Sequence, residues 1–216
     1  MSKTFNTLIA VLSFGVAAYA IVAYAAMPIG AVLHPDIRVT FAAHSVAIVY
    51  LHVFGAALAL LLGPFQFWRR LRAGRPQLHR WIGRGYLAAG VGVGGVTGLL
   101  LAFNAYGGLW SRSGFAALAL LWLATGLMAL TSIRRGDVPA HRSWMMRNYA
   151  LTLAAVMLRL YLPAALVAGV DLALAYPLVA WLCWAPNLLL AEWLVRRSAE
   201  AGARQSGSGF ALAWRA

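Results

Sequence analysis

The chain has 216 residues, of which 62% are hydrophobic and only 11% are charged. A soluble core of this size cannot hide that much apolar surface, so the composition excludes an ordinary soluble domain and indicates a polytopic helical membrane protein. The formal net charge of +13 does not predict nucleic-acid binding, because the arginines gather in short turns between apolar runs, as in the cytoplasmic loops of membrane proteins.

Apolar runs of about 20 residues recur along the chain, which is the length that crosses a hydrocarbon layer of ~30 Å. They predict an all-α protein with a six-span transmembrane domain over residues 1–198, with spans at about 7–27, 41–67, 81–103, 114–133, 143–168 and 175–195. The first run exceeds the ~7–15 apolar residues of a signal peptide, so we interpret it as a retained anchor helix. Residues 199–216 are predicted to form a poorly ordered cytoplasmic tail, because they are rich in Gly and Ser.

Several residues within these spans predict local departures from a straight helix. Gly63-Pro64 indicates a kink or break near the end of the second span, and Pro163 indicates a bend in the fifth. The third span contains five glycines that let neighbouring helices approach closely: Gly90, Gly92, Gly94, Gly95 and Gly98.

The distribution of positive charge predicts the orientation of the chain. With six spans, 15 of the 18 Lys and Arg residues fall on the side of the N-terminus, Arg38 and Arg112 fall on the other side, and Arg159 lies within the membrane. The positive-inside rule then places both termini in the cytoplasm.

A direct repeat relates two basic segments of the chain. The pattern His-Arg-Trp-x-x-Arg-x-Tyr begins at His79 and recurs from His141 with one inserted residue, 62 positions later. Spans two and three, and spans four and five, are then two copies of one hairpin, as in membrane proteins with parallel repeats. The repeat predicts a central four-helix bundle flanked by spans one and six.

His79 and His141 are the first candidates for chemistry, because a pseudo-twofold axis brings them face to face. Two imidazoles on facing helices can ligate a b-type haem, with His79 and His141 as axial ligands and Arg84 and Arg147 near the propionates. The alternative is that each His-Arg pair caps its helix or contacts a lipid phosphate.

His52 and Arg159 are the second candidates, because both lie about 13–17 Å from the outer end of their spans. A cation at that depth needs backbone acceptors, a water-filled cavity or an anionic ligand such as a haem propionate or a quinone oxygen near Arg159. His44 could line one cavity with His52, although a lone histidine near the end of a span is more often an interfacial residue, and Asn187, Tyr50 and Tyr161 are possible neighbours of Arg159. The alternative is an arginine that extends to the outer interface.

Glu192 is the one acidic residue predicted inside a span. A salt bridge with Arg84 near the inner face is the preferred interpretation, and a proton-relay carboxylate is the alternative. The sequence has no phosphate-binding loop, no Ser-His-Asp arrangement and no zinc-binding H-E-x-x-H motif.

Several separate motifs, in order between His44 and Trp193, resemble a bacterial family of predicted membrane proteins, domain of unknown function 2306. They begin at Gly63, His79, His141, Arg159 and Trp181. A weaker likeness is to the ascorbate-reducible b-type cytochromes, which also have six spans and a four-helix core with histidine pairs. His79 and His141 match the pair on spans three and five, but span four lacks a histidine, so the pair on spans two and four cannot form.

These observations leave three functions open. The first is a redox or electron-transfer protein of the inner membrane that uses haem b or quinone. The second is a non-catalytic accessory or assembly subunit of a larger membrane complex, which the short loops and the lack of a full catalytic set favour. The third is a small-solute transporter with a cavity at His52 and Arg159.

Overall fold

The computed structural model describes residues 3–213, with side chains at 4–40 and 43–200. Within that part of the chain every regular element is helical, and six helical stretches are long and apolar enough to cross a membrane. The predicted all-α, six-span fold is therefore confirmed. The spans are Thr4–Ala26, Val46–Phe67, Pro76–Ala102, Gly108–Arg134, Val138–Val167 and Leu172–Glu200.

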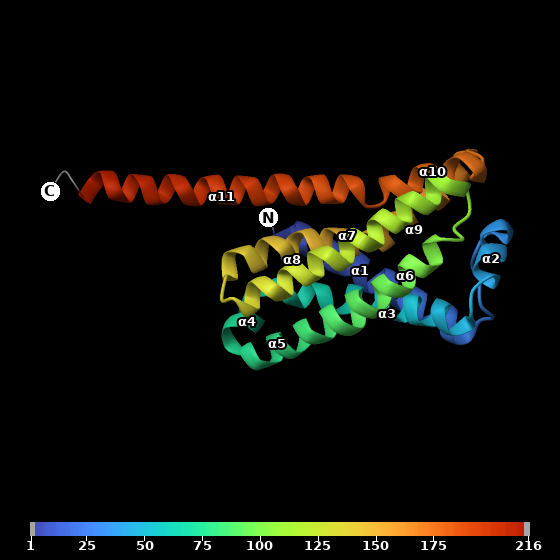
Figure 1. The fold of residues 1–216 in the computed structure, drawn as a ribbon, viewed down its shortest axis with the longest axis horizontal. Coiled ribbons are helices and arrows are strands. Elements are labelled where there is room, and N and C mark those ends of the chain that lie inside the picture. Colours follow the sequence, from blue (N-terminus) through green and yellow to red (C-terminus); the bar gives the residue numbers. More distant parts are fainter. Residues whose placement is uncertain (1–2, 214–216) are drawn as a thin grey trace.

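Several spans are built from more than one helical element (Figure 1). The third span consists of α5, η1 and α6. The fifth span consists of α8 and α9, and the sixth consists of α10 followed by α11. The elements are α1 (Lys3–Ala26), α2 (Pro35–Ala42), α3 (Val46–Phe67), α4 (Arg69–Gly74), α5 (Pro76–Gly85), η1 (Tyr86–Val93), α6 (Gly94–Ala102), α7 (Gly108–Arg134), α8 (Val138–Thr152), α9 (Ala154–Val167), α10 (Leu172–Leu182) and α11 (Ala185–Ala213).

Polar caps set where several of these helices begin. The second span begins at Val46 rather than near residue 41, because the Ser45 hydroxyl accepts a hydrogen bond from the Ile48 backbone N–H (3.4 Å). Residues 35–42 form the separate helix α2 instead of a loop. Asp137 caps α8 through the Ala140 N–H (2.9 Å), and Asp171 caps α10 through the Ala173 N–H (2.7 Å).

The two prolines expected to disturb spans two and five lie inside continuous helices. Of the kink or break predicted at Gly63-Pro64, the break does not occur, since α3 continues to Phe67. The fifth span is interrupted at Leu153, ten residues before Pro163, and α9 runs through that proline to Val167. Neighbouring helices make such prolines tolerable in membrane spans.

The chain segments predicted as a basic turn and a tail are also helical. α4 and the first part of α5 occupy the basic segment after span two, with Pro76 at the first position of α5, where its missing N–H costs nothing. The backbone of α11 continues to Ala213, so most of the segment predicted as a poorly ordered tail is helix. The side chains of Lys3, Arg204 and Arg215, which are part of the charge count, lie outside the described residues.

Spans two to five form the core of the bundle. α3 packs against α5, η1 and α6; α6 packs against α7; α7 packs against α8; and α3 meets α8, which closes the ring. α1 flanks this ring on α3 and α9, while α10 and α11 lie against α7, α9 and α8. This is the predicted arrangement of a four-helix core with spans one and six outside it.

Glycines allow the closest approach within this core. A Cβ added to Gly55 of α3 would lie 2.9 Å from the backbone nitrogen of Gly94, and one added to Gly90 would lie 3.0 Å from the Cβ of Ala59. Spans two and three therefore touch along their backbones, as the glycines predict.

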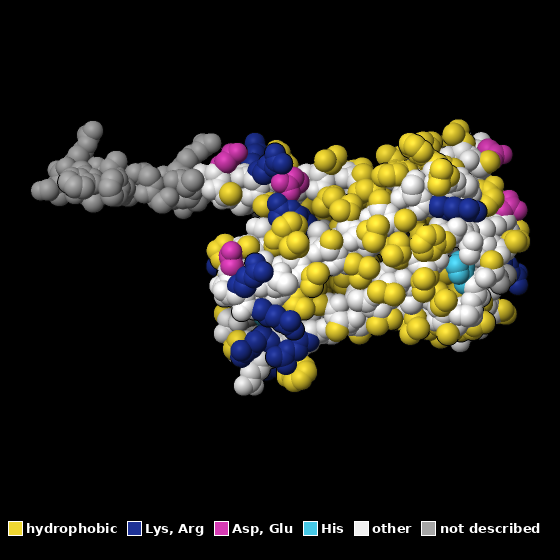
Figure 2. All heavy atoms as spheres, viewed as in Figure 1, with side chains coloured by type: hydrophobic (Ala, Val, Ile, Leu, Met, Phe, Trp, Pro, Cys, Tyr) yellow, Lys and Arg dark blue, Asp and Glu magenta, His cyan; other side chains and the backbone are white. Residues whose placement is uncertain are grey.

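The two ends of the bundle differ in charge. The α4 and α5 region lies at the same end as the start of α8, and α11 projects from that end, whereas α2 lies at the opposite end (Figure 1). Figure 2 shows Lys and Arg side chains gathered at the first of these ends and a largely hydrophobic surface between the two. We call these the basic end and the α2 end.

Candidate functional site

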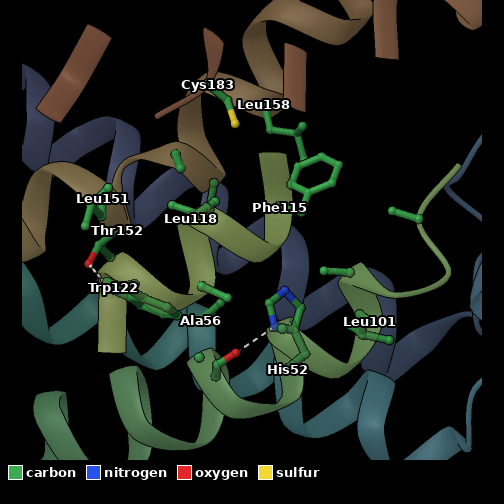
Figure 3. A pocket seen from close by; sticks show the side chains of 18 of the residues that line it. His52, Ala56, Leu101, Phe115, Leu118, Trp122, Leu151, Thr152, Leu158 and Cys183 are labelled. Carbon is green, nitrogen blue, oxygen red and sulfur yellow. Dashed lines mark hydrogen bonds between the residues drawn. The ribbon is translucent and has the colours of Figure 1, made fainter. Parts of the chain in front are cut away.

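A cavity of about 180 Å³ opens between the spans in the half of the bundle nearest α2. Side chains from spans two to six line it, and apolar groups such as Phe115, Leu118 and Leu158 form much of its wall (Figure 3). His52 and Arg159, which the sequence places at similar depth, both line this cavity, and His44 lines it as well.

His52 of α3 is held in one tautomer by the backbone of span three. Its Nδ1 lies 2.9 Å from the carbonyl oxygen of Gly94, and because a carbonyl can only accept, Nδ1 must carry the proton. Gly98 makes room for the ring, since an added Cβ there would lie 2.8 Å from the His52 Cε1. Nε2 is then an unprotonated acceptor in the neutral ring, and Figure 3 shows it turned into the cavity.

Arg159 of α9 brings a cation to the same cavity. Its Nη1 donates to the carbonyl oxygen of Ala155, one turn earlier in the same helix (3.0 Å). None of the ion pairs among the described side chains includes Arg159. A guanidinium has five N–H donors, so most of its donors remain available to a group in the cavity.

The three other possible neighbours of Arg159 lie outside the cavity. Asn187 donates to the carbonyl oxygens of Cys183 (3.0 Å) and Ala150 (3.4 Å), Tyr50 stacks on Phe54, and Tyr161 is 40% exposed. None of the three lines the cavity.

A buried polar cluster adjoins the cavity at the centre of the bundle. The Tyr86 hydroxyl donates to Asn148 Oδ1 (2.6 Å) and lies 2.8 Å from Thr152 Oγ1, which also accepts from Trp122 Nε1 (2.9 Å). Asn148 Nδ2 donates in turn to the Trp122 carbonyl (2.7 Å) and to Thr125 Oγ1 (2.8 Å). Trp122 and Thr152 also line the cavity, so this cluster, which joins spans three, four and five, forms part of its floor.

The sequence repeat contains the signal for this cluster. Tyr86 and Asn148 are 62 residues apart, the same separation as His79 and His141. The inserted residue of the second copy turns Tyr149 by about 100° from the direction of its counterpart Tyr86. Tyr149 therefore contacts Ser13 of α1 (2.9 Å between hydroxyl oxygens) and Gly63 of α3 instead.

The two repeat histidines lie near the basic end and have different surroundings. His141 Nδ1 donates to the carbonyl oxygen of Ala129 in α7 (2.8 Å), so its Nε2 is the free ring nitrogen. The Nδ1 of His79 is buried and has no hydrogen-bond partner among the described residues. Gln66 Nε2 is also buried without a hydrogen-bond partner among the described residues. The Gln66 side chain lies against Gly83, one turn from His79.

The arginines of the repeat are held by aromatic rings. The guanidinium carbon of Arg84 lies 4.6 Å from the centre of the Trp81 ring, and that of Arg147 lies 4.7 Å from the Trp144 ring. The preferred salt bridge between Glu192 and Arg84 is wrong. Glu192 pairs with Arg147 (2.7 Å) and with Arg196 (2.8 Å), because α11 packs against α8.

A model of a known protein family matches most of the chain. The model of the DUF2306 family, described as a predicted membrane protein, matches residues 49–195 of the chain, which confirms the resemblance seen in the motifs. No curated protein and no solved structure matches the chain. The likeness to the ascorbate-reducible b-type cytochromes has no support from these comparisons.

Proposed function

We propose that this chain, which belongs to the DUF2306 family of predicted membrane proteins, binds a small lipophilic ligand of the quinone type in the cavity that spans two to six line. The observation that carries the proposal is the pairing of two complementary polar groups in an otherwise apolar cavity. His52 offers an acceptor nitrogen, and Arg159 offers several N–H donors.

The size of the cavity favours a single substituted ring. Apolar cavities of roughly 150 Å³ in proteins accept benzene, so about 180 Å³ suits one ring with small substituents. Phe115, Leu118 and Leu158 supply the apolar walls for such a ring. A haem macrocycle is far larger than this space.

The polar groups suit the two oxygens of a quinone and its reduced form. A guanidinium donor stabilises a carbonyl oxygen or the oxyanion of a deprotonated hydroxyl. The neutral imidazole of His52 accepts a hydrogen bond from a quinol hydroxyl at Nε2 and can take its proton there. The site thus provides ligand positioning and a proton acceptor for a quinone-linked redox role.

Equilibrium binding of a short-chain quinone to the purified protein tests this proposal. Arg159→Gln is expected to weaken binding about tenfold or more, since hydrogen bonds to charged groups contribute about 1.5–3 kcal/mol. His52→Phe is expected to weaken it several-fold. Arg112→Gln and His34→Gln change exposed residues outside the cavity and serve as matched controls. Equal affinity in all five proteins would exclude the site.

A second candidate function is haem b binding between His79 and His141. Two observations favour it: the backbone bond of His141 Nδ1 leaves Nε2 free to ligate iron, and the buried Nδ1 of His79 has no partner among the described residues. Arg84 is the better candidate to pair with a propionate, because Arg147 is already paired with Glu192. A purified protein without a Soret band after haem supplementation would exclude this function.

We also propose that the basic end faces the cytoplasm in the inner membrane of a bacterium. The support is the concentration of Lys and Arg at that end, which the positive-inside rule places in the cytoplasm (Figure 2). A reporter enzyme that is active only outside the cytoplasm, fused to the C-terminus, is expected to stay inactive.

A further inference from the structure

A second hollow lies at the basic end, far along the bundle from the quinone-type site. This groove of about 410 Å³ lies between the end of α3 and the helices α4 and α5. Its walls combine apolar side chains with two arginines. The lining used in the argument below is Trp68, Leu71, Leu78, Ile82, Arg70 and Arg75.

The local sequence explains why the groove exists. α3 ends at Phe67, Trp68 adopts an extended conformation, and α4 then runs for six residues before Arg75 breaks the helix ahead of Pro76. This double turn folds α4 back beside α5. Leu78 and Ile82 are one turn apart on α5, so they present one continuous apolar strip to the groove.

None of the helices that form the groove, α3, α4 and α5, carries an acidic residue. The chain contains no Asp or Glu between Asp36 and Asp137, whereas six arginines occur between residues 69 and 84. Arg70 and Arg75 are exposed, and neither takes part in an ion pair among the described side chains. Figure 2 shows the resulting concentration of positive charge over the α4 and α5 region. An anion is therefore the complement of this surface.

The apolar walls decide which anion fits. A free phosphate or a sulfate uses only the guanidinium groups and leaves Leu71, Leu78 and Ile82 in contact with water. An anionic phospholipid uses both the charged and the apolar parts of the groove, since its phosphate contacts the arginines while the adjoining hydrocarbon covers the apolar strip. Trp68, which is 52% exposed beside the groove, is typical of the interface where lipid headgroups lie.

We propose that this groove is a binding site for one anionic phospholipid, with Arg70 and Arg75 on the phosphate and the strip of α5 on the first part of an acyl chain. The site goes beyond the quinone-type function and shares no residue with that cavity. Basic pockets beside transmembrane helices on the cytoplasmic side are the places where such headgroups bind.

The test compares lipid retention by the full-length protein purified in mild detergent, measured by native mass spectrometry. The probes are phosphatidylglycerol, phosphatidylcholine of the same chain length, and inorganic phosphate. We expect the protein to retain about tenfold more phosphatidylglycerol than phosphatidylcholine. The double variant Arg70→Gln/Arg75→Gln is expected to lose that preference.

A matched control separates a built site from general attraction to charge. Arg134→Gln/Arg135→Gln removes two exposed arginines from the other basic segment, outside the groove, and is expected to keep the preference within about twofold. Equal loss in both double variants would overturn the proposal in favour of a diffuse electrostatic effect. Unchanged retention in the first variant, or displacement of the lipid by an equal concentration of inorganic phosphate, would also overturn it.

Discussion

Replacing Tyr86 by Phe removes one hydroxyl from the centre of the bundle and tests whether the buried polar cluster holds the spans together. Tyr86 is fully buried, and its hydroxyl bonds Asn148 Oδ1 and contacts Thr152 Oγ1. The aromatic ring remains in Tyr86→Phe, so packing is kept and only the polar contacts are lost. The substitution therefore isolates the polar contribution to stability.

The magnitude follows from what each partner loses. A net hydrogen bond in a protein contributes about 0.5–1.5 kcal/mol, and those between membrane helices average about 0.6 with a maximum near 1.7. Thr152 keeps the bond from Trp122, but Asn148 Oδ1 loses its only donor among the described residues. A buried acceptor without a partner adds a further penalty. We expect a loss of about 1–3 kcal/mol in the free energy of unfolding.

Reversible unfolding of the purified protein, from mild detergent into increasing sodium dodecyl sulfate, measures this loss. Tyr161→Phe is the matched control, because Tyr161 is 40% exposed and should change stability by less than about 0.5 kcal/mol. A double-mutant cycle with Asn148→Leu should give a coupling energy of about 1 kcal/mol. A Tyr86→Phe protein as stable as the wild type, with no coupling, would refute the reasoning.

Two further predictions concern helix contacts and can be measured by the same unfolding assay. Gly55→Ala should destabilise the protein by about 1–3 kcal/mol, because its Cβ would meet the Gly94 backbone at 2.9 Å, whereas Gly15→Ala meets nothing within 4 Å and should be neutral or stabilising. Arg147→Gln should cost about 1–2 kcal/mol, since its side chain is only 17% exposed and joins α8 to Glu192 of α11. Its more exposed counterpart Arg196→Gln should cost less than about 0.5 kcal/mol, and equal losses in the two arginine variants would contradict this assignment.

The number of spans could be predicted from the sequence because it depends on a strong, local signal. Runs of about 20 apolar residues report the thickness of the bilayer, whatever the helices pack against. The glycines of span three were informative for a similar reason, since a helix crossing needs small residues on the contact face. Residues such as Gly94 therefore indicate a neighbour even without knowledge of which helix it is.

The helix boundaries were less accessible, because they depend on single side chains. Ser45 begins α3 and Pro76 begins α5, whereas Pro64 and Pro163 do not end their helices. A proline ends a helix only where no neighbouring group satisfies the freed carbonyl. That condition belongs to tertiary structure and cannot be read from the order of residues.

The candidate site was predictable in part. Depth along the helix axis brought His52 and Arg159 to one cavity, because rise per residue is nearly constant. The direction of a side chain around the axis is less predictable, and Asn187 and Tyr161, two possible neighbours of Arg159, do not line the cavity. The pairing of Glu192 with Arg147 instead of Arg84 was also beyond the sequence, because the two arginines occupy equivalent positions on different helices and only α8 packs against α11.

Photolabelling is the sharpest test of quinone binding in the cavity, because it locates the ligand as well as detecting it. A short-chain quinone that carries a photoreactive group on its ring would be irradiated with the purified protein, and the labelled peptides identified by mass spectrometry. The account predicts labels on cavity-lining residues near His52 and Arg159, such as Phe115 and Leu158, which an excess of unlabelled quinone prevents. Labels spread over the lipid-facing surface, or labels that excess quinone does not reduce, would contradict it.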